Sequence, residues 1–144
     1  MPQTSSFELH PRLEHDSIAI GRFELCQLRM QNDSQYPWFI LVPERKDITE
    51  IYQLDIADQQ QLSLESCYLA EQLAKCYSAD KMNIAAIGNL VPQLHIHHIV
   101  RYQNDKTWPA PVWGKLPAIA YTQVAITEQK NRLKKYLTTL ISIN

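Results

Sequence analysis

The sequence has almost no net charge, few cysteines and no long apolar run. Its 14 basic and 15 acidic residues leave a formal net charge of −1, so no overall field would attract nucleic acid or an anionic membrane. The apolar runs, such as residues 38–42, are much shorter than the roughly 20 residues of a membrane-spanning helix. We therefore expect no nucleic-acid partner and no membrane partner, and any recognition of phosphate has to be local.

Cysteine usage indicates a reducing compartment. The three cysteines, Cys26, Cys67 and Cys76, form neither an even set nor a close C-x-x-C pair. The sequence opens on a polar stretch at residues 1–6 rather than on a basic and apolar leader. We expect reduced thiols and a cytoplasmic protein.

Length and composition fit one globular domain. At 144 residues, with 45% hydrophobic residues, the chain can bury a core without the help of a metal or of disulfides. It shows no internal repeat and no low-complexity linker. We predict a single domain over residues 1–144, with its core at about 7–105 and a C-terminal arm and helix at about 106–144.

The first third of the chain is predicted to form strands. Two apolar clusters around Gly21 indicate a strand pair over residues 18–30, and turn-forming residues follow at 31–35. Residues 38–42 are aromatic and branched, as in a buried strand, and Pro43 ends the run.

A long amphipathic helix is predicted over residues 58–77. The segment lacks Gly and Pro, and Asp55 or Asp58 can cap its start. Its apolar residues have helical spacing, namely Leu62, Leu69, Leu73 and Cys76.

The last third is predicted to combine a strand pair, an irregular arm and a helix. A strand at 82–87 and a tight turn at Gly88-Asn89 would lead into an antiparallel partner strand that carries the histidines. Residues 108–114, with two prolines, a glycine and two tryptophans, cannot be regular structure. A helical stripe follows at Leu133, Tyr136, Leu137, Leu140 and Ile141, and its basic neighbours Lys130, Arg132, Lys134 and Lys135 are interpreted as a solvated face.

The segment Gln93-Leu94-His95-Ile96-His97-His98-Ile99-Val100-Arg101 holds three of the five histidines. In an extended strand successive side chains point to opposite faces. One face then carries Gln93, His95, His97, Ile99 and Arg101, and the other carries Leu94, Ile96, His98 and Val100. An edge strand that turns its polar side to water would explain any one of these histidines. The recurrence of polar residues beside an uninterrupted apolar series favours a functional site.

His95 is the candidate nucleophile of this strand. A neutral imidazole that is fixed in one tautomer can attack phosphorus and form a phosphoramidate. His97 would lie about 7 Å further along, near enough to bind phosphate oxygens or to pass a proton to a leaving group. Arg101 could contact the same anion from further out.

Metal binding is the alternative use of a His-x-His strand, and it needs further ligands. None is obvious, because His10 and His15 lie in a polar N-terminal stretch and the cysteines lack zinc-ligand spacing. We expect neither a metal nor a cofactor. His98, on the opposite face, is interpreted as a packing histidine.

The stretch from Gly88 to Arg101 resembles the signature of the histidine triad (HIT) superfamily, His-φ-His-φ-His-φ-φ, where φ is apolar. The pattern is often preceded by Gly-Gln and followed by Arg. The resemblance places Gln93 at the first histidine, His95 at the central nucleophile, His97 at the third histidine and Asn89 at the amide of the Gly-Gln pair. The strand at 38–43 and the helix at 58–77 follow the family's order. Residues 108–114 look like the tail of a bacterial subgroup in which Gln replaces the first histidine.

This resemblance implies an α+β fold with a largely antiparallel sheet of about five strands, one long helix packed on it and a C-terminal helix. It implies a homodimer, and hydrolysis or transfer at the α-phosphate of a nucleotide such as a dinucleoside polyphosphate or a nucleoside phosphoramidate. His95 would form a nucleotidyl-histidine, and Asn89 and His97 would hold phosphate oxygens. Asn32 resembles the polar residue that contacts the ribose, although Asp33 could take that role.

Gln93 is where the sequence departs from the family pattern. An amide can orient a neighbour but cannot act as an acid or base near pH 7. The alternative to an enzyme is therefore a catalytically weak nucleotide-binding or sensing protein of the same fold. Trp108 and Trp113 are interpreted as a cover for the sheet edge or a dimer contact, with a border of the nucleotide pocket as the alternative.

Overall fold

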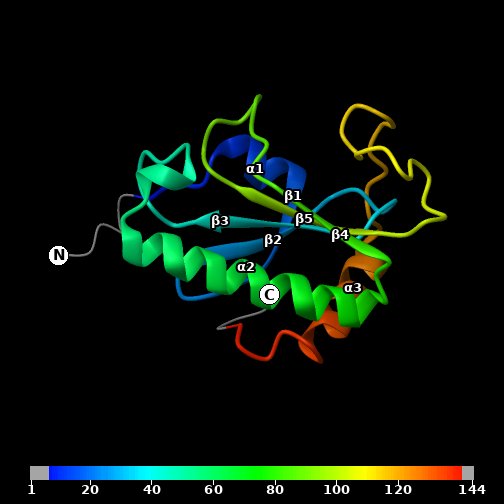
Figure 1. Ribbon diagram of the computed structural model, residues 1–144. Helices are drawn as coiled ribbons and strands as arrows, with labels where there is room; N and C mark the ends of the chain where they lie inside the picture. Colours follow the sequence, from blue (N-terminus) through cyan, green and yellow to red (C-terminus); the bar gives the residue numbers. More distant parts are fainter. Residues whose placement is uncertain (1–6, 141–144) are drawn as a thin grey trace.

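The computed structural model describes residues 7–140 and contains a five-stranded sheet in the order β1-β2-β3-β5-β4 (Figure 1). Every pair of neighbouring strands is antiparallel. The predicted α+β fold with about five strands is therefore confirmed. The strands are β1 (Ser17–Arg22), β2 (Cys26–Gln31), β3 (Trp38–Pro43), β4 (Lys81–Ala85) and β5 (Ile96–Arg101).

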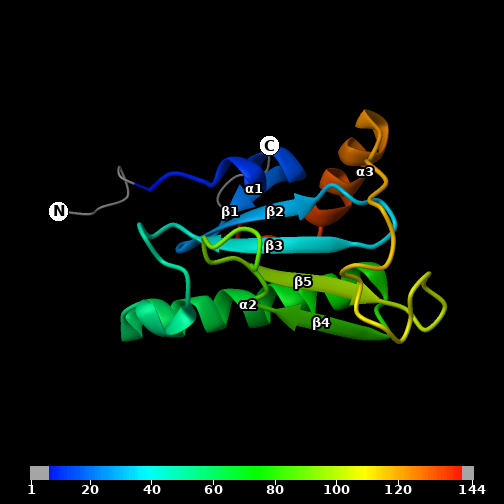
Figure 2. The ribbon, with the colours of Figure 1, turned by 90° about the horizontal axis from the view of Figure 1, so that it is seen from above.

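Helix α2 (Ile56–Tyr77) covers one face of the sheet (Figure 2). It begins two residues before the predicted start, because the Asp55 side chain caps it by accepting a hydrogen bond from the Asp58 amide at 2.8 Å. The predicted stripe is buried and packs in one cluster with Ile96 and Val100 of β5. At about 1.5–3 kcal/mol for each buried leucine or isoleucine, this layer is the main source of stability.

The opposite face of the sheet has a smaller cover. Helix α1 (Pro11–Asp16), residues 86–95 and the irregular arm beyond β5 lie on this face (Figure 1). Their apolar side chains join those of β3 and β5 in a second cluster of buried residues, formed by Leu13, Tyr36, Trp38, Ile40, Val42, Val91, Ile99 and Val112. The predicted alternation along β5 is confirmed, because Ile99 packs here and Val100 packs on the α2 side.

The predicted tight turn at Gly88-Asn89 is wrong. Strands β4 and β5 do pair, but residues 86–95, which we call the histidine loop, connect them over an irregular path. Gly88 does not have a positive φ, so its backbone conformation does not explain why this position is a glycine. The strand also begins later than predicted, at Ile96, and His95 and Gln93 belong to the loop.

The predicted C-terminal helix is displaced. Helix α3 (Gln123–Lys134) begins at the Thr122 cap and ends before most of the apolar stripe. Leu133 and Leu137 are nevertheless buried against the core, through turns rather than through one continuous helix, and Ile141 lies outside the described residues. Arg132 is exposed, as predicted for a solvated face, and it also donates to the Cys76 carbonyl at 2.8 Å and stacks on Tyr77. Residues 108–114 are irregular, as predicted.

No helix in the described part of the chain is both long enough and apolar enough to cross a membrane.

Candidate active site

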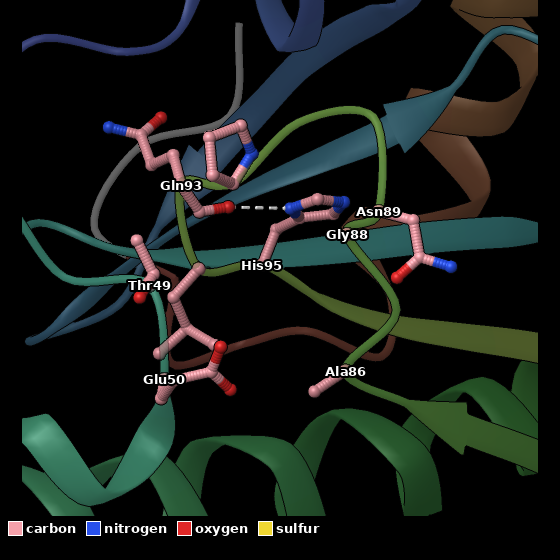
Figure 3. A pocket seen from close by; sticks show the side chains of 9 residues that line it. Thr49, Glu50, Ala86, Gly88, Asn89, Gln93 and His95 are labelled. Carbon is pink, nitrogen blue, oxygen red and sulfur yellow. Dashed lines mark hydrogen bonds between the residues drawn. The ribbon is translucent and has the colours of Figure 1, made fainter.

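His95 lies at the end of the histidine loop, with its ring between Gly88 and the backbone of Gln93 (Figure 3). Its Nδ1 is 2.8 Å from the Gln93 carbonyl oxygen. A carbonyl can only accept, so Nδ1 carries the proton and donates it. The lone pair of the neutral ring is then on Nε2, which is the form required of a nucleophile.

The surroundings keep His95 neutral. Only 6% of the residue is exposed. Burial lowers the pKa of His95 below its ordinary value, the hydrogen bond to Gln93 partly opposes this, and the nearby charge of His10 lowers the pKa further. The ring is therefore unprotonated near pH 7.

His97 has both ring nitrogens engaged by the protein. The Trp38 indole N–H donates to Nδ1 at 3.0 Å, so Nε2 carries the ring proton and donates to the Ile87 carbonyl at 2.9 Å. Burial lowers the pKa of His97 to about 4. In this arrangement His97 fixes the histidine loop to β5 and has no nitrogen free for a phosphate oxygen, which differs from the role expected of it.

Trp38→Phe is expected to lower the free energy of unfolding by about 1–3 kcal/mol, because the buried Nδ1 of His97 loses its donor. Chemical denaturation measures this change. The matched control is Trp113→Phe, which trims a neighbouring ring that packs edge-on against His97 with centroids 5.1 Å apart. An equal loss in the two variants would mean that ring volume matters and the hydrogen bond does not.

His98 is a packing histidine, as interpreted from its face. Its Nε2 lies 2.7 Å from the Ser66 hydroxyl of α2, its Nδ1 lies 3.1 Å from the Ile96 carbonyl, and the residue is fully buried. Burial lowers its pKa to about 4. His98 thus joins the sheet to α2 on the side away from His95.

Two cavities meet at His95, Gly88 and Asn89. The larger, of about 370 Å³, is mainly apolar, and we call it the apolar cavity. Its floor and walls include Leu13, Trp38, Ile87, Val91 and Trp113, with polar groups from Arg12, Asp16 and Gln31. The smaller, of about 330 Å³, is the polar cavity, lined by Thr49, Glu50 and the loop residues around Gln93 (Figure 3). Both volumes are within the range of small-molecule sites.

Gly88 allows the histidine loop to close on His95. A Cβ at this position would lie 2.5 Å from the Val91 carbonyl oxygen and 3.1 Å from Cε1 of the His95 ring. The first distance is shorter than any normal contact, and the atom involved belongs to the backbone. The glycine is therefore required by this close approach and not by a turn.

Two of the predicted phosphate and ribose contacts lie outside both cavities. Arg101 is buried and pairs with both carboxylate oxygens of Asp105, at 2.8 and 3.1 Å, and with Asn83. Burial raises the pKa of Asp105, but hydrogen bonds led by that from Arg101 outweigh it and lower the pKa to about 2. Asn32 accepts from the Tyr121 amide at 2.9 Å and so holds the C-terminal arm. We leave Arg101 and Asn32 out of the proposed site.

Several residues of the apolar cavity could not be found from the sequence. Gln31 lines it one position before the predicted Asn32, and Arg12 and Asp16 reach it from α1, which carries no recognisable motif. The two tryptophans of the arm differ in role. Trp113 lines the apolar cavity, whereas Trp108 lies over the Arg101 guanidinium at 5.6 Å and serves packing, as interpreted.

Within residues 7–140, no three or more His, Cys, Asp and Glu side chains gather closely enough to hold a metal ion.

The model of the HIT domain family matches residues 12–104 of this chain. Among solved structures, a histidine triad protein from Marinobacter aquaeolei VT8 is 48% identical, with a TM-score of 0.91 over 93% of this chain and 98% of that one. A histidine triad protein from Sinorhizobium meliloti 1021 is 42% identical, with a TM-score of 0.91 over 93% and 99%. One from Bradyrhizobium japonicum is 40% identical, with a TM-score of 0.88 over 91% and 98%. The comparison with curated proteins gave no match.

Proposed function

The chain belongs to the HIT domain family, and from this premise we propose that it is a nucleotide hydrolase or nucleotidyl transferase in which His95 forms a covalent intermediate. The observation that carries the proposal is the tautomer of His95. Its Nδ1–H is tied to the Gln93 carbonyl, which leaves the lone pair on Nε2, and His95 lines both cavities.

The proposed reaction has two displacements at the α-phosphorus. Nε2 of His95 forms a bond to phosphorus while the bond to the leaving group breaks, and the leaving group departs with the electron pair and takes up a proton. Water, or another acceptor, then attacks phosphorus and breaks the N–P bond. The products are a nucleoside monophosphate or its ester and the regenerated neutral imidazole.

The apolar cavity suits the nucleoside. Trp113 and Leu13 offer apolar surface to a base, and Asp16 and Gln31 supply groups that can hydrogen-bond to ribose hydroxyls. Asn89 lines both cavities, and its amide would donate to a phosphate oxygen.

The polar cavity would then hold the leaving group, which lies on the opposite side of the phosphorus from the nucleoside. Its described lining contains the Glu50 carboxylate and neither lysine nor arginine. A polyphosphate carries several negative charges and would be repelled there. We therefore favour a leaving group with little negative charge, as in a nucleoside phosphoramidate, over a dinucleoside polyphosphate.

Assembly and compartment are also part of the proposal. Strand β4 forms an edge of the sheet and exposes half of Ile84, which supports a homodimer as in the family resemblance. The three cysteines are free thiols, which supports a cytoplasmic location.

A substrate panel tests the proposed reaction. We expect nucleoside phosphoramidates to be turned over with kcat/KM at least about tenfold above that of dinucleoside polyphosphates of the same base. Repulsion between two like charges about 4 Å apart costs about 1 kcal/mol in water and more in a partly screened site, and about 1.4 kcal/mol corresponds to tenfold. Product release is followed by chromatography. The reverse preference would contradict the assignment of the polar cavity.

A nucleotide-binding protein without turnover is the second candidate. It is favoured by the geometry of His97 and Gln93, because the protein engages the polar atoms of both and neither is free to pass a proton. On this alternative, nucleotides bind and no product of any member of the panel appears.

A further inference from the structure

The side chain of Gln93 pairs with the backbone of the N-terminal segment, residues 8–10. Its Nε2 donates to the Glu8 carbonyl at 2.8 Å, and its Oε1 accepts from the His10 amide at 2.8 Å. These partners are 85 and 83 positions away in the sequence. The amide thus makes the two opposed hydrogen bonds that a neighbouring strand would make with the same residues.

We propose that Gln93 is a positioning residue for nucleotide binding, because it anchors the N-terminal segment that carries one wall of the apolar cavity. The inference rests on the proposed function, since it assigns the nucleoside to that cavity. Gln93, which stands in place of the first motif histidine, would then help to build the site and take no part in proton transfer.

The wall in question is α1, which follows the anchored segment directly. His10 caps α1 by accepting from the Arg12 amide at 3.0 Å, and Arg12, Leu13 and Asp16 then line the apolar cavity. A helix of six residues is not stable by itself. Its position therefore depends on tertiary anchors at both of its ends.

The two ends of α1 are anchored differently. At its C-terminal end the Ser17 hydroxyl donates to the Leu13 carbonyl and accepts from the Arg29 side chain at 2.7 Å, which fixes the helix to β1 and β2. At its N-terminal end the pair of hydrogen bonds from Gln93 fixes residues 8–10 to the histidine loop. Loss of Gln93 would free that end while the other stays in place.

An amide suits this task better than an imidazole. The donor and acceptor of a glutamine side chain point to the same side and match a backbone N–H and C=O of one strand. The two nitrogens of an imidazole diverge and cannot serve both. Restoring the motif with Gln93→His is therefore not expected to improve binding.

The test compares Gln93→Ala and Gln93→Glu with the wild type. In Gln93→Glu the volume is kept and the His10 amide retains an acceptor, but the Glu8 carbonyl faces a carboxylate oxygen in place of a donor. Hydrogen exchange of the His10 amide measures whether the hydrogen bonds of residue 93 still hold residues 8–10. Affinities for adenosine and guanosine 5′-monophosphates, together with kcat and KM for the best substrate of the panel, measure whether α1 still forms its wall of the apolar cavity.

We expect both variants to lose at least about tenfold in protection of the His10 amide and about tenfold in affinity for the monophosphate that binds best, because each loses a hydrogen bond that orders the segment. KM should rise to the same extent, with kcat changed less than about threefold.

Several outcomes would overturn the proposal. They are unchanged protection in Gln93→Ala, unchanged affinity despite lost protection, and a fall in kcat at constant KM, which would place Gln93 in the chemical step. Wild-type affinity in Gln93→Glu would likewise show that the side chain only fills space. If the wild-type protein binds neither monophosphate, the proposed function fails, whereas the exchange measurement still decides whether Gln93 anchors the segment.

Discussion

His95→Ala is expected to reduce turnover by at least about 10³-fold while nucleotide binding is retained. The variant removes the only atom proposed to bond to phosphorus, and loss of a covalent nucleophile has effects of this size or larger. Binding should change little, because His95→Ala keeps every other residue that lines the apolar cavity. Steady-state kinetics and nucleotide titration of the same preparation measure both quantities.

The matched control for this variant is His98→Ala. His98 lies three positions further along the chain, in β5, but it faces α2 and contacts Ser66. This change should lower stability through lost packing and leave the folded variant active. Equal activity of His95→Ala and the wild type would remove His95 from the reaction and favour the nucleotide-binding alternative.

Gly88→Ala is expected to lower kcat by about 10²-fold. The added methyl group would overlap the Val91 carbonyl oxygen and press on the His95 ring, so the loop or the ring has to move. A displacement of about 1 Å at a nucleophile is enough for a loss of this size. The measurement is kcat at saturating substrate, together with the melting temperature of the variant.

Gly114→Ala is the control for Gly88→Ala. Gly114 also lines the apolar cavity, but its φ is +73° and a Cβ there would meet no atom within 4 Å. This variant should lose about 1 kcal/mol of stability through its backbone conformation, with a much smaller effect on kcat than Gly88→Ala. A comparable fall in kcat in both variants would show that general destabilisation, and not displacement of His95, limits the rate.

Much of the sheet could be predicted because its signals are local. The alternation along residues 93–101 depends only on the period of a strand, and it correctly assigned Ile99 and Val100 to opposite faces. The Asp55 cap and the leucine spacing of α2 are equally local signals. These features need no knowledge of which strands become neighbours.

The wrong predictions concern segments whose conformation depends on packing against distant parts of the chain. Gly88 and Asn89 have the composition of a tight turn, but the loop they belong to extends to His95 because it closes over the apolar cavity. The stripe from Leu133 onward has helical spacing, yet α3 ends at Lys134, and the β-branched Thr138 and Thr139 that follow are poor helix formers.

The site itself was predicted only in part. The central place of His95 in the motif could be read from the spacing of the histidines, but its tautomer depends on a backbone carbonyl two residues away. The Trp38–His97 hydrogen bond depends on the pairing of β3 with β5, which the sequence does not specify. The contacts of Gln93 with residues 8 and 10 span more than 80 positions and have no sequence signal.

Intact-protein mass spectrometry after brief exposure to nucleoside phosphoramidates and dinucleoside polyphosphates, with rapid acid-free quenching, tests covalent catalysis by His95 directly. We expect a mass increase of one nucleotidyl group in the wild type and none in His95→Ala. An adduct of the same mass on His95→Ala, or turnover by the wild type without any adduct on the time scale of a single turnover, would contradict covalent catalysis by His95.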